Sequence, residues 1–132
     1  HGKDCAVKFT CDKRYSPPAP SVEIQIGLPG EELARSVLTA FVDTGADTTI
    51  IPLSHIERLN AQVDSQRHIR SQWGEHRQVY LYLVNIVVAG IRLSAVEVVA
   101  DEMGAEIIVG RNVLNKLVIS LDGPKRIIEI LE

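Results

Sequence analysis

The sequence predicts an all-β, barrel-like domain with one short helix near its carboxy-terminal end. Short apolar runs recur along the chain, several with the two-residue alternation of half-buried strands. Glycine, proline and aspartate separate these runs at positions typical of tight turns. With 132 residues, 45% of them hydrophobic, the chain is long enough for one core and too short for two ordinary domains. Many short strands around one core favour a barrel.

The amino-terminal segment differs in composition from the rest of the chain. Residues 1–15 carry mixed charge with little periodicity, and residues 16–20 form a proline-rich connector that is incompatible with a helix. We therefore expect residues 1–20 to form an extended polar tail and residues 21–132 to form the folded domain.

The first part of that domain predicts three strands. Ser21–Ile26 alternates apolar and polar residues, and Gly27–Gly30 has the composition of a turn. Leu33–Val42 is expected to return as the second strand, and a third strand is expected to begin at about Thr48.

The middle of the chain predicts a short helical segment and a hairpin. Leu53–Leu59 has room for one or two helical turns, with Ser54 as a possible N-cap. Val79–Ala89 and Ile91–Ala100 are rich in β-forming residues and meet at Gly90, which predicts a long hairpin.

The last part of the chain predicts a strand, a short helix and a closing pair of strands. Glu106–Leu114 is an apolar strand that runs into a glycine and then a short helix ending near Lys116. Leu117–Leu121 and Arg126–Leu131 flank a turn at residues 122–124 and are expected to pair.

Charge and hydropathy exclude several classes of partner. The chain has 14 basic and 17 acidic residues, a net charge of −3, so it lacks the positive field that non-specific nucleic-acid binding requires. Val79–Ala89 is among the longest apolar runs and is far shorter than the roughly 20 residues that span a bilayer. We expect no nucleic-acid partner and no membrane contact from this segment.

The cysteines and histidines predict no metal site and no cofactor. Two cysteines and four histidines lack the spacing of a ligand set. Cys5 and Cys11 are interpreted as thiols of a reducing, cytoplasmic compartment, and a disulfide between them is the alternative. The chain begins without methionine, so we expect it to be excised from a longer one.

The most informative stretch is Phe41–Pro52, which places an acidic residue, a hydroxyl and a glycine between two apolar strands. Asp43 is expected on a tight turn, where a carboxylate is costly without partners or a function. Thr44 offers a hydroxyl to the turn, and Gly45 permits close approach of another chain or a ligand. Taken alone, an Asp-Thr-Gly triplet is more often an Asx-type turn.

A second motif changes that interpretation. The Asp-Thr-Gly-Ala-Asp sequence is followed about sixty positions later by Ile107–Leu114. Together, in this order, the two motifs resemble those of the retropepsin-like aspartic proteases, the homodimeric relatives of retroviral proteases. The resemblance covers about residues 21–131. It implies a retropepsin-like acid protease barrel with one half-site per chain.

The resemblance also implies roles for individual residues. The implied roles are catalytic for Asp43, Thr44 and Gly45, substrate-binding for Ala46, Asp47, Trp73 and Gly74, and support of the site for Gly110, Arg111 and Asn112. Arg111 is expected to pair with Asp47 as a structural tie, a simple surface ion pair being the alternative. Ile50, Leu53 and Val113 are expected to line an apolar cleft.

Two further features follow from the resemblance. The loop at Ser71–His76 occupies the place of the flap that closes over substrate, although it has a single glycine where retroviral flaps have several. Trp73 is expected at a hairpin tip or in a binding loop, or else folded back onto the core. We expect the dimer sheet to be built mainly from the carboxy-terminal strands, above all residues 127–131.

Peptide hydrolysis by carboxylates requires two of them sharing one proton, and this chain has one Asp-Thr-Gly. The resemblance therefore implies an aspartic endopeptidase, active as a homodimer on peptides or proteins with hydrophobic residues at the cleavage site. One alternative is a catalytically weak, protease-like domain that serves as a dimerisation or peptide-binding module. Another is an unrelated β-barrel with a fortuitous triplet.

Overall fold

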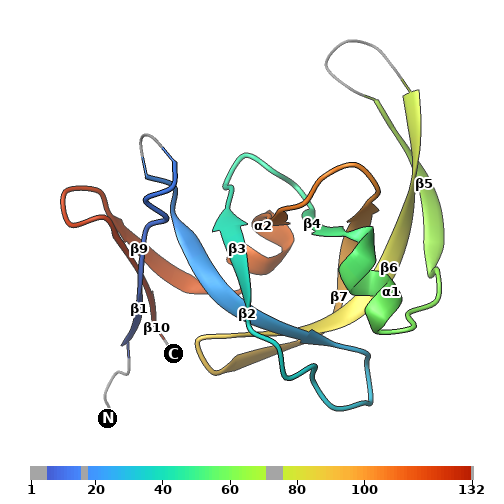
Figure 1. Ribbon diagram of the computed structural model, residues 1–132, viewed down its shortest axis with the longest axis horizontal. Coiled ribbons are helices and arrows are strands. Elements are labelled where there is room, and N and C mark those ends of the chain that lie inside the picture. The colour runs from blue at the N-terminus through green and yellow to red at the C-terminus, as the bar shows by residue number, and fades with distance from the viewer. Residues whose placement is uncertain (1–5, 16–17, 71–75, 132) are drawn as a thin grey trace.

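The computed structural model describes residues 6–15, 18–70 and 76–131 (Figure 1). Within these ranges the chain forms ten strands and two short helices. The strands are β1 (Ala6–Thr10), β2 (Ser21–Gly27), β3 (Leu38–Val42), β4 (Thr49–Pro52), β5 (Ser65–Arg70), β6 (His76–Val88), β7 (Ile91–Asp101), β8 (Ile107–Val109), β9 (Val118–Asp122) and β10 (Ile127–Leu131). The helices are α1 (Leu53–Arg58) and α2 (Arg111–Leu114). The prediction of an all-β fold is confirmed.

Seven strands form the barrel sheet in the order β2-β3-β8-β4-β7-β6-β5. The sheet closes because β2 pairs with β3 through its first half and with β6 through its second half. The predicted long hairpin is β6 and β7, which meet at Ala89 and Gly90, both with positive φ. Such a two-residue turn matches the twist of the strands that it joins.

Strand β8 occupies the position that determines the site. It lies between β3 and β4, parallel to β3 with Val42 opposite Val109, and antiparallel to β4 with Ile50 opposite Ile108. Because parallel strands end at the same edge of a sheet, the segments after Val42 and Val109 emerge side by side. These segments begin with Asp43 and Gly110.

The core lies inside the barrel and follows the alternation seen in the sequence. In β2, Val22, Ile24 and Ile26 are each at most 3% exposed, whereas Glu23 between them faces solvent. The core continues through one face of β6, β7 and β8 and ends on Ile128 and Ile130 of β10. No helix in the described ranges is long and apolar enough to cross a membrane.

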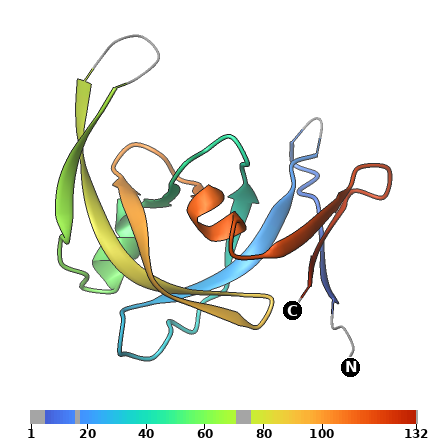
Figure 2. The same cartoon turned by 180° about the vertical axis from the view of Figure 1, so that it is seen from behind.

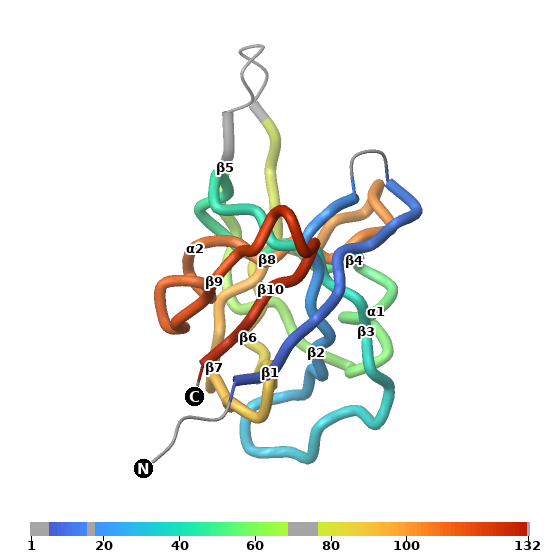
Figure 3. Tube along the Cα trace, turned by 90° about the vertical axis from the view of Figure 1, so that its left-hand side faces the viewer, coloured from blue at the N-terminus to red at the C-terminus, as the bar shows by residue number. Residues whose placement is uncertain are grey.

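The remaining three strands form a second sheet in the order β1-β10-β9 (Figures 2 and 3). The predicted pairing of the last two strands is confirmed, with Ile128 opposite Leu121. The expectation of an extended polar tail is wrong for Ala6–Thr10, because β1 pairs along its whole length with β10. Phe9 is half-buried and packs against the core. Flanking charges hide this short alternating pattern in the sequence.

Several element boundaries differ from the sequence expectations. β3 begins only at Leu38, and β5 was not expected as a strand because its polar sequence shows no apolar alternation. The helical turns considered after β4 form α1, but the N-cap position is Pro52 and not Ser54. The short helix predicted near the carboxy-terminal end is α2. In Figure 1, the β5–β6 hairpin projects away from the barrel.

The packing of β1 gives a first testable prediction. Replacing Phe9 with alanine should lower the free energy of unfolding by about 1–2 kcal/mol, because a half-buried ring is removed from the core. Lys8→Ala is the matched control, since its side chain is 64% exposed and its loss should change stability by less than about 0.5 kcal/mol. Denaturant unfolding of both variants measures their free energies of unfolding. Equal stability of the two would mean that β1 is not part of the folded body.

Candidate active site

The Asp43 loop is held mainly by backbone hydrogen bonds. The Asp43 amide donates to the Val109 carbonyl at 3.0 Å, which extends the β3–β8 pairing by one residue. The Ala46 amide donates to the Asp43 carbonyl at 3.2 Å and closes a turn. The Gly45 amide donates to Asp43 Oδ1 at 2.9 Å. The loop is therefore an Asx-type turn, and that geometry fixes the direction of the carboxylate.

The three residues of the triplet face solvent. Asp43, Thr44 and Gly45 are all exposed in the single chain. Within the described part of the chain, Asp43 makes no salt bridge with a lysine or arginine. An exposed carboxylate held at a defined angle by its own loop is available to a second molecule.

The segment after β8 braces this loop from behind. The Arg111 amide donates to the Ala46 carbonyl at 2.8 Å, and the Asn112 amide donates to the Asp47 carbonyl at 3.3 Å. Gly110 permits this approach, since a Cβ there would lie 2.5 Å from the Thr48 carbonyl oxygen. Any residue can adopt the Gly110 φ of −96°, so glycine is required here because a side chain would not fit and not because of the backbone conformation.

A buried polar network joins the same two segments. Thr49 is fully buried, and its hydroxyl donates to Asn112 Oδ1 at 2.8 Å while accepting from the Gly110 amide at 3.1 Å. The Asn112 side-chain amide donates to the Glu97 carbonyl on β7 at 2.8 Å. Each of these polar groups is paired, so hydrogen bonds offset the cost of burying them and the network holds the loop. Thr49 was not among the residues predicted for the site, and its signal in the sequence is a hydroxyl at the start of a buried apolar strand.

The Asp47–Arg111 pair forms with a distance of 2.5 Å between the two side chains. The Asp47 side chain is 85% exposed and that of Arg111 is 49% exposed. An ion pair so open to solvent contributes about 0–1 kcal/mol to stability. In the single chain, the pair therefore has the character of a surface ion pair, and the backbone contacts of the same two residues hold the loop.

The amino-terminal segment contacts the strand that leads into the loop. The Tyr15 ring packs edge-on against Phe41, with 5.1 Å between ring centroids, and its hydroxyl bonds to the Glu106 carboxylate. Phe41 lies in β3 opposite Ile108 of β8, so the aromatic pair packs on the strand that leads into the Asp43 loop. No local pattern could have revealed this contact, because Tyr15 and Phe41 come from separate segments.

The other residues expected at the site have different outcomes. Trp73 and Gly74 lie outside the described residues, as does Cys5, so the proposed flap contacts and the disulfide alternative stay predictions. Val113 is 1% exposed and belongs to the core, so it does not line a cleft. The described residues contain no cluster of three or more histidine, cysteine or acidic side chains suited to a metal.

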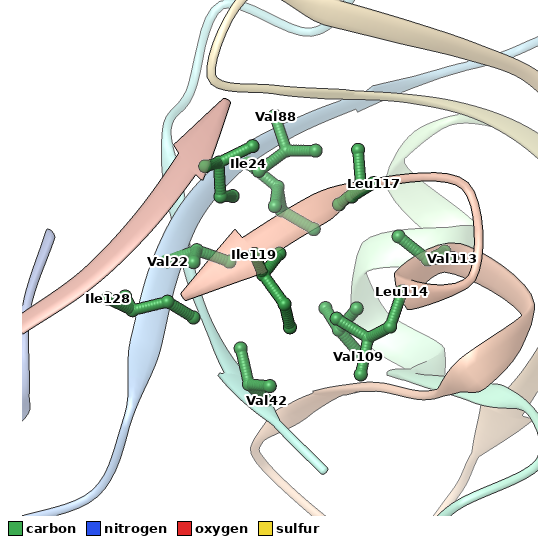
Figure 4. A pocket seen from close by; sticks show the side chains of 11 residues that line it. Val22, Ile24, Val42, Val88, Val109, Val113, Leu114, Leu117, Ile119 and Ile128 are labelled. Atoms are coloured by element: carbon green, nitrogen blue, oxygen red, sulfur yellow. The ribbon is translucent and has the colours of Figure 1, made fainter. Parts of the chain in front are cut away.

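Beneath the loop lies a small apolar pocket (Figure 4). Val42 and Val109, the last residues of β3 and β8, line it together with Val113, Ile119 and Ile128. Its free volume is only about 10 Å³, too small for a peptide side chain. The pocket is a gap in the core, and it shows that the Asp43 loop rests on the same apolar layer as β9 and β10.

The close approach at Gly110 gives the second prediction. Gly110→Ala should lower the free energy of unfolding by more than about 2 kcal/mol, because the new methyl group would overlap the Thr48 carbonyl. Gly123→Ala is the control, since a Cβ there has no atom within 4 Å. Thermal unfolding of both variants measures the difference. If the two alanine variants unfold at the same temperature, the loop does not depend on this contact.

Comparison with solved structures identifies the fold. A retropepsin-like aspartic protease from Rickettsia conorii superposes with a TM-score of 0.68 at 11% sequence identity, over 98% of this chain and 92% of that one. The EIAV protease, solved with the inhibitor HBY-793, superposes with a TM-score of 0.53 at 21% identity, over 74% of this chain and 86% of that one. At such identities the likeness establishes a retropepsin-like fold and nothing finer.

Comparison of sequences identifies the family. Among curated protein sequences, none matches this chain. A family profile described as gag-polyprotein putative aspartyl protease matches residues 33–116. The matched residues are more than half of the chain and contain both the Asp43 loop and the segment that braces it. This chain therefore belongs to the gag-polyprotein putative aspartyl protease family.

Proposed function

We propose that this chain is an aspartic endopeptidase, active as a homodimer, that hydrolyses peptide bonds with a water molecule activated between two copies of Asp43. The observation that supports the proposal most is the exposure and fixed orientation of the Asp43 carboxylate. It is exposed, its Oδ1 is fixed by the Gly45 amide, and its loop is braced by Gly110–Asn112. Such an arrangement presents a carboxylate in a fixed direction to something outside the chain.

The requirement for two chains follows from the chemistry. One carboxylate must be ionised to take a proton from water, and another must be protonated to donate one to the substrate. Two carboxylates a few ångströms apart meet this requirement, because both cannot be ionised at once. The chain has one Asp-Thr-Gly, so the second carboxylate comes from a second copy across a two-fold axis.

The reaction then proceeds by proton exchange within the pair. The ionised Asp43 removes a proton from water, and the water oxygen bonds to the scissile carbonyl carbon. The protonated Asp43 of the partner subunit gives its proton to the carbonyl oxygen, which forms a tetrahedral diol. When the diol collapses, the C–N bond breaks, the now protonated Asp43 gives its proton to the amide nitrogen, and the ionised carboxylate of the partner subunit takes the proton of a diol hydroxyl. One carboxylate is then protonated and the other ionised, as at the start of the cycle.

The other residues of the loop position the pair and the substrate. Thr44 braces the two loops against each other, and Gly45 lets the substrate backbone approach. Ala46 and Asp47 contact the substrate, and Gly110, Arg111 and Asn112 support the loop through the contacts described above. The family resemblance implies substrates with hydrophobic residues at the cleavage site.

The β5–β6 hairpin acts as the flap in this proposal. It projects from the barrel, and its strands are paired from Ser65 opposite Leu81 to Arg70 opposite His76 (Figure 1). Trp73 and Gly74 fall between the two arms in the sequence. Closure of this hairpin over a bound peptide would exclude water from the reacting bond.

The third prediction concerns catalysis directly. Asp43→Asn should abolish peptide cleavage while leaving folding and dimerisation nearly intact, because an amide neither takes the proton from water nor donates one in its place. Asp64→Asn, on an exposed carboxylate outside the site, is the matched control and should retain full activity. Cleavage of a fluorogenic peptide library by both variants measures the effect.

Two outcomes would contradict the proposal. Cleavage by Asp43→Asn at the wild-type rate would remove Asp43 from the mechanism. Wild-type protein that binds peptides at high concentration but releases no products would favour the alternative, a peptide-binding module with a protease-like fold.

The fourth prediction concerns the shared site. Asp43→Asn added in ninefold excess over wild-type chains should reduce their specific activity to about one tenth, because most wild-type chains would then sit in mixed dimers with one carboxylate. The same excess of an unrelated protein is the control. Activity that does not change on mixing would mean that each chain works alone.

A further inference from the structure

We propose that Tyr15 and Glu106 form a subsite for a lysine or arginine side chain of the substrate, within about three positions of the scissile bond. This inference rests on the proposed function and deepens it, because it names a charge that the substrate carries. Hydrophobic residues at the bond itself remain compatible with it. Three observations support the subsite: an apolar surface on the face of the sheet that carries Asp43, an aromatic wall beside that surface, and a carboxylate that lacks a basic partner.

The side chains of β3 and β8 alternate between the core and one outer face. Val42 and Val109 line the apolar pocket of the core (Figure 4). Phe41 and Ile108, which precede them and lie opposite each other, therefore project from the outer face. The Asp43 amide continues the β3–β8 pairing by donating to the Val109 carbonyl. By the two-residue period of a strand, Asp43 leaves the sheet on the same face as Phe41.

This outer face has an apolar surface. Phe41, Ile108 and Ile50 come from the neighbouring strands β3, β8 and β4, and Ile108 lies opposite both of the others. All three are half-buried, and they belong neither to the barrel core nor to the side chains that pack against it. Partly open apolar side chains of this kind hold the aliphatic stem of a long charged side chain.

Tyr15 forms a wall beside this surface. Its position in the chain lies between Asp12 and Ala19, whose backbones exchange hydrogen bonds of 2.7 and 3.1 Å. The Tyr15 ring packs edge-on against Phe41, and its hydroxyl donates to Glu106 Oε1. Because one side chain touches both Phe41 and Glu106, these two residues lie on the same face of the sheet. Tyr15 is 37% exposed, so part of it stays open to a ligand.

Glu106 supplies a charge that is not compensated. Within the described part of the chain, its exposed carboxylate forms no salt bridge with a lysine or arginine. The pKa of Arg14 is raised mainly by its hydrogen bonds to Asp12 and more weakly by the charge of Glu106. The Arg14 guanidinium is held by Asp12, with 2.6 Å between Nη2 and Oδ2. With Asp43 on the same face, the surface attracts a cation.

These features together match a lysine or arginine side chain. Its stem packs on the apolar surface, and its cationic head reaches the Glu106 carboxylate. The neighbouring Tyr15 ring adds a cation–π contact. A neutral side chain of the same length gains the apolar contact alone, and an acidic one is repelled by the carboxylate. The surface therefore selects for charge as well as for length.

The strand register sets the distance of this subsite from the reacting bond. Ile107 lies opposite Ala40, and Glu106 is one residue further from the Asp43 loop. Glu106 is thus level with a position four residues before Asp43, about 13 Å at about 3.3 Å per residue. The long stem of a basic side chain covers part of this distance, so its residue belongs about two or three positions from the bond. A two-fold dimer places one such subsite on either side.

Matched peptides test the preference for charge. A peptide set with a central hydrophobic pair carries lysine, norleucine or glutamate at one of the three positions on either side of the expected bond. Norleucine keeps the stem and removes the charge. At the best position, the wild-type kcat/KM should be about tenfold higher for lysine than for norleucine, mainly through KM, and lowest for glutamate. Added salt should reduce the lysine-to-norleucine ratio.

Substitutions connect this ratio to Glu106. Glu106→Gln should reduce the lysine-to-norleucine ratio to about 1, because the amide carries no charge. Glu106→Lys should reverse the preference, so that the glutamate peptide becomes a better substrate than the lysine peptide. Glu102→Gln, on an exposed carboxylate of the same loop, is the control and should keep the wild-type ratio.

Two variants of Tyr15 distinguish a positioning role from a structural one. Tyr15→Phe keeps the ring but loses the hydroxyl that orients the Glu106 carboxylate, so the ratio should fall about threefold. Tyr15→Ala loses the ring as well and should reduce the ratio further. If both variants lower the melting temperature but keep the wild-type ratio, Tyr15 is a structural contact and its role in the subsite is wrong.

The results separate this inference from the proposed function. If wild-type chains cleave peptides without preferring lysine at any position, or if Glu106→Gln keeps the preference, the inference is wrong and the proposed protease stands. If wild-type chains cleave no peptide, the proposed function fails, and fluorescence anisotropy with the same peptides decides the inference. Tighter binding of a lysine peptide that is lost in Glu106→Gln would support the subsite, and equal binding of the three kinds of peptide would overturn it.

Discussion

The contact between the Gly110 segment and the Asp43 loop is the constraint on which the rest of the structure depends. β8 lies between β3 and β4, so the two chain segments that follow β3 and β8 emerge at one edge of the sheet. Gly110 lets them meet at backbone distance, and the buried Thr49 hydroxyl joins them. Without this contact the Asp43 loop would be an ordinary exposed turn, free to change direction.

The architecture of the barrel was predictable from the sequence because its strands bury one face. The alternation in Ser21–Gly27 and the long runs of β6 and β7 identify strands without further information. β5 and β1 escaped prediction for physical reasons. β5 has a single apolar residue, Ile69, so its sequence has no apolar period, and the apolar side of β1 is a short alternation surrounded by charges. β5 and β1 become strands because they pair with β6 and β10. Pairing between distant segments leaves no local pattern in a single sequence.

The site was predictable only in part. The Asp43 motif and the Gly110 motif occur in the same order as in the family that they resemble. That resemblance predicted that the two segments meet. The hydroxyl of Thr49 and the ring of Tyr15 were missed, because their importance comes from residues more than twenty positions away in the chain. The pairing of both edges of Ile127–Leu131 within the chain was not predicted either. An apolar sequence such as Ile127–Leu131 indicates burial, but it does not distinguish a strand buried within its own sheet from one buried by a partner.

The central claim is that this fold presents half of an active site, completed by its own copy. A crystal structure of the dimer tests it most directly, through the position of the two Asp43 carboxylates. The two carboxylates are expected to face each other across a two-fold axis, close enough to share one water molecule. A dimer in which the two copies of Asp43 point to separate outer surfaces would contradict it.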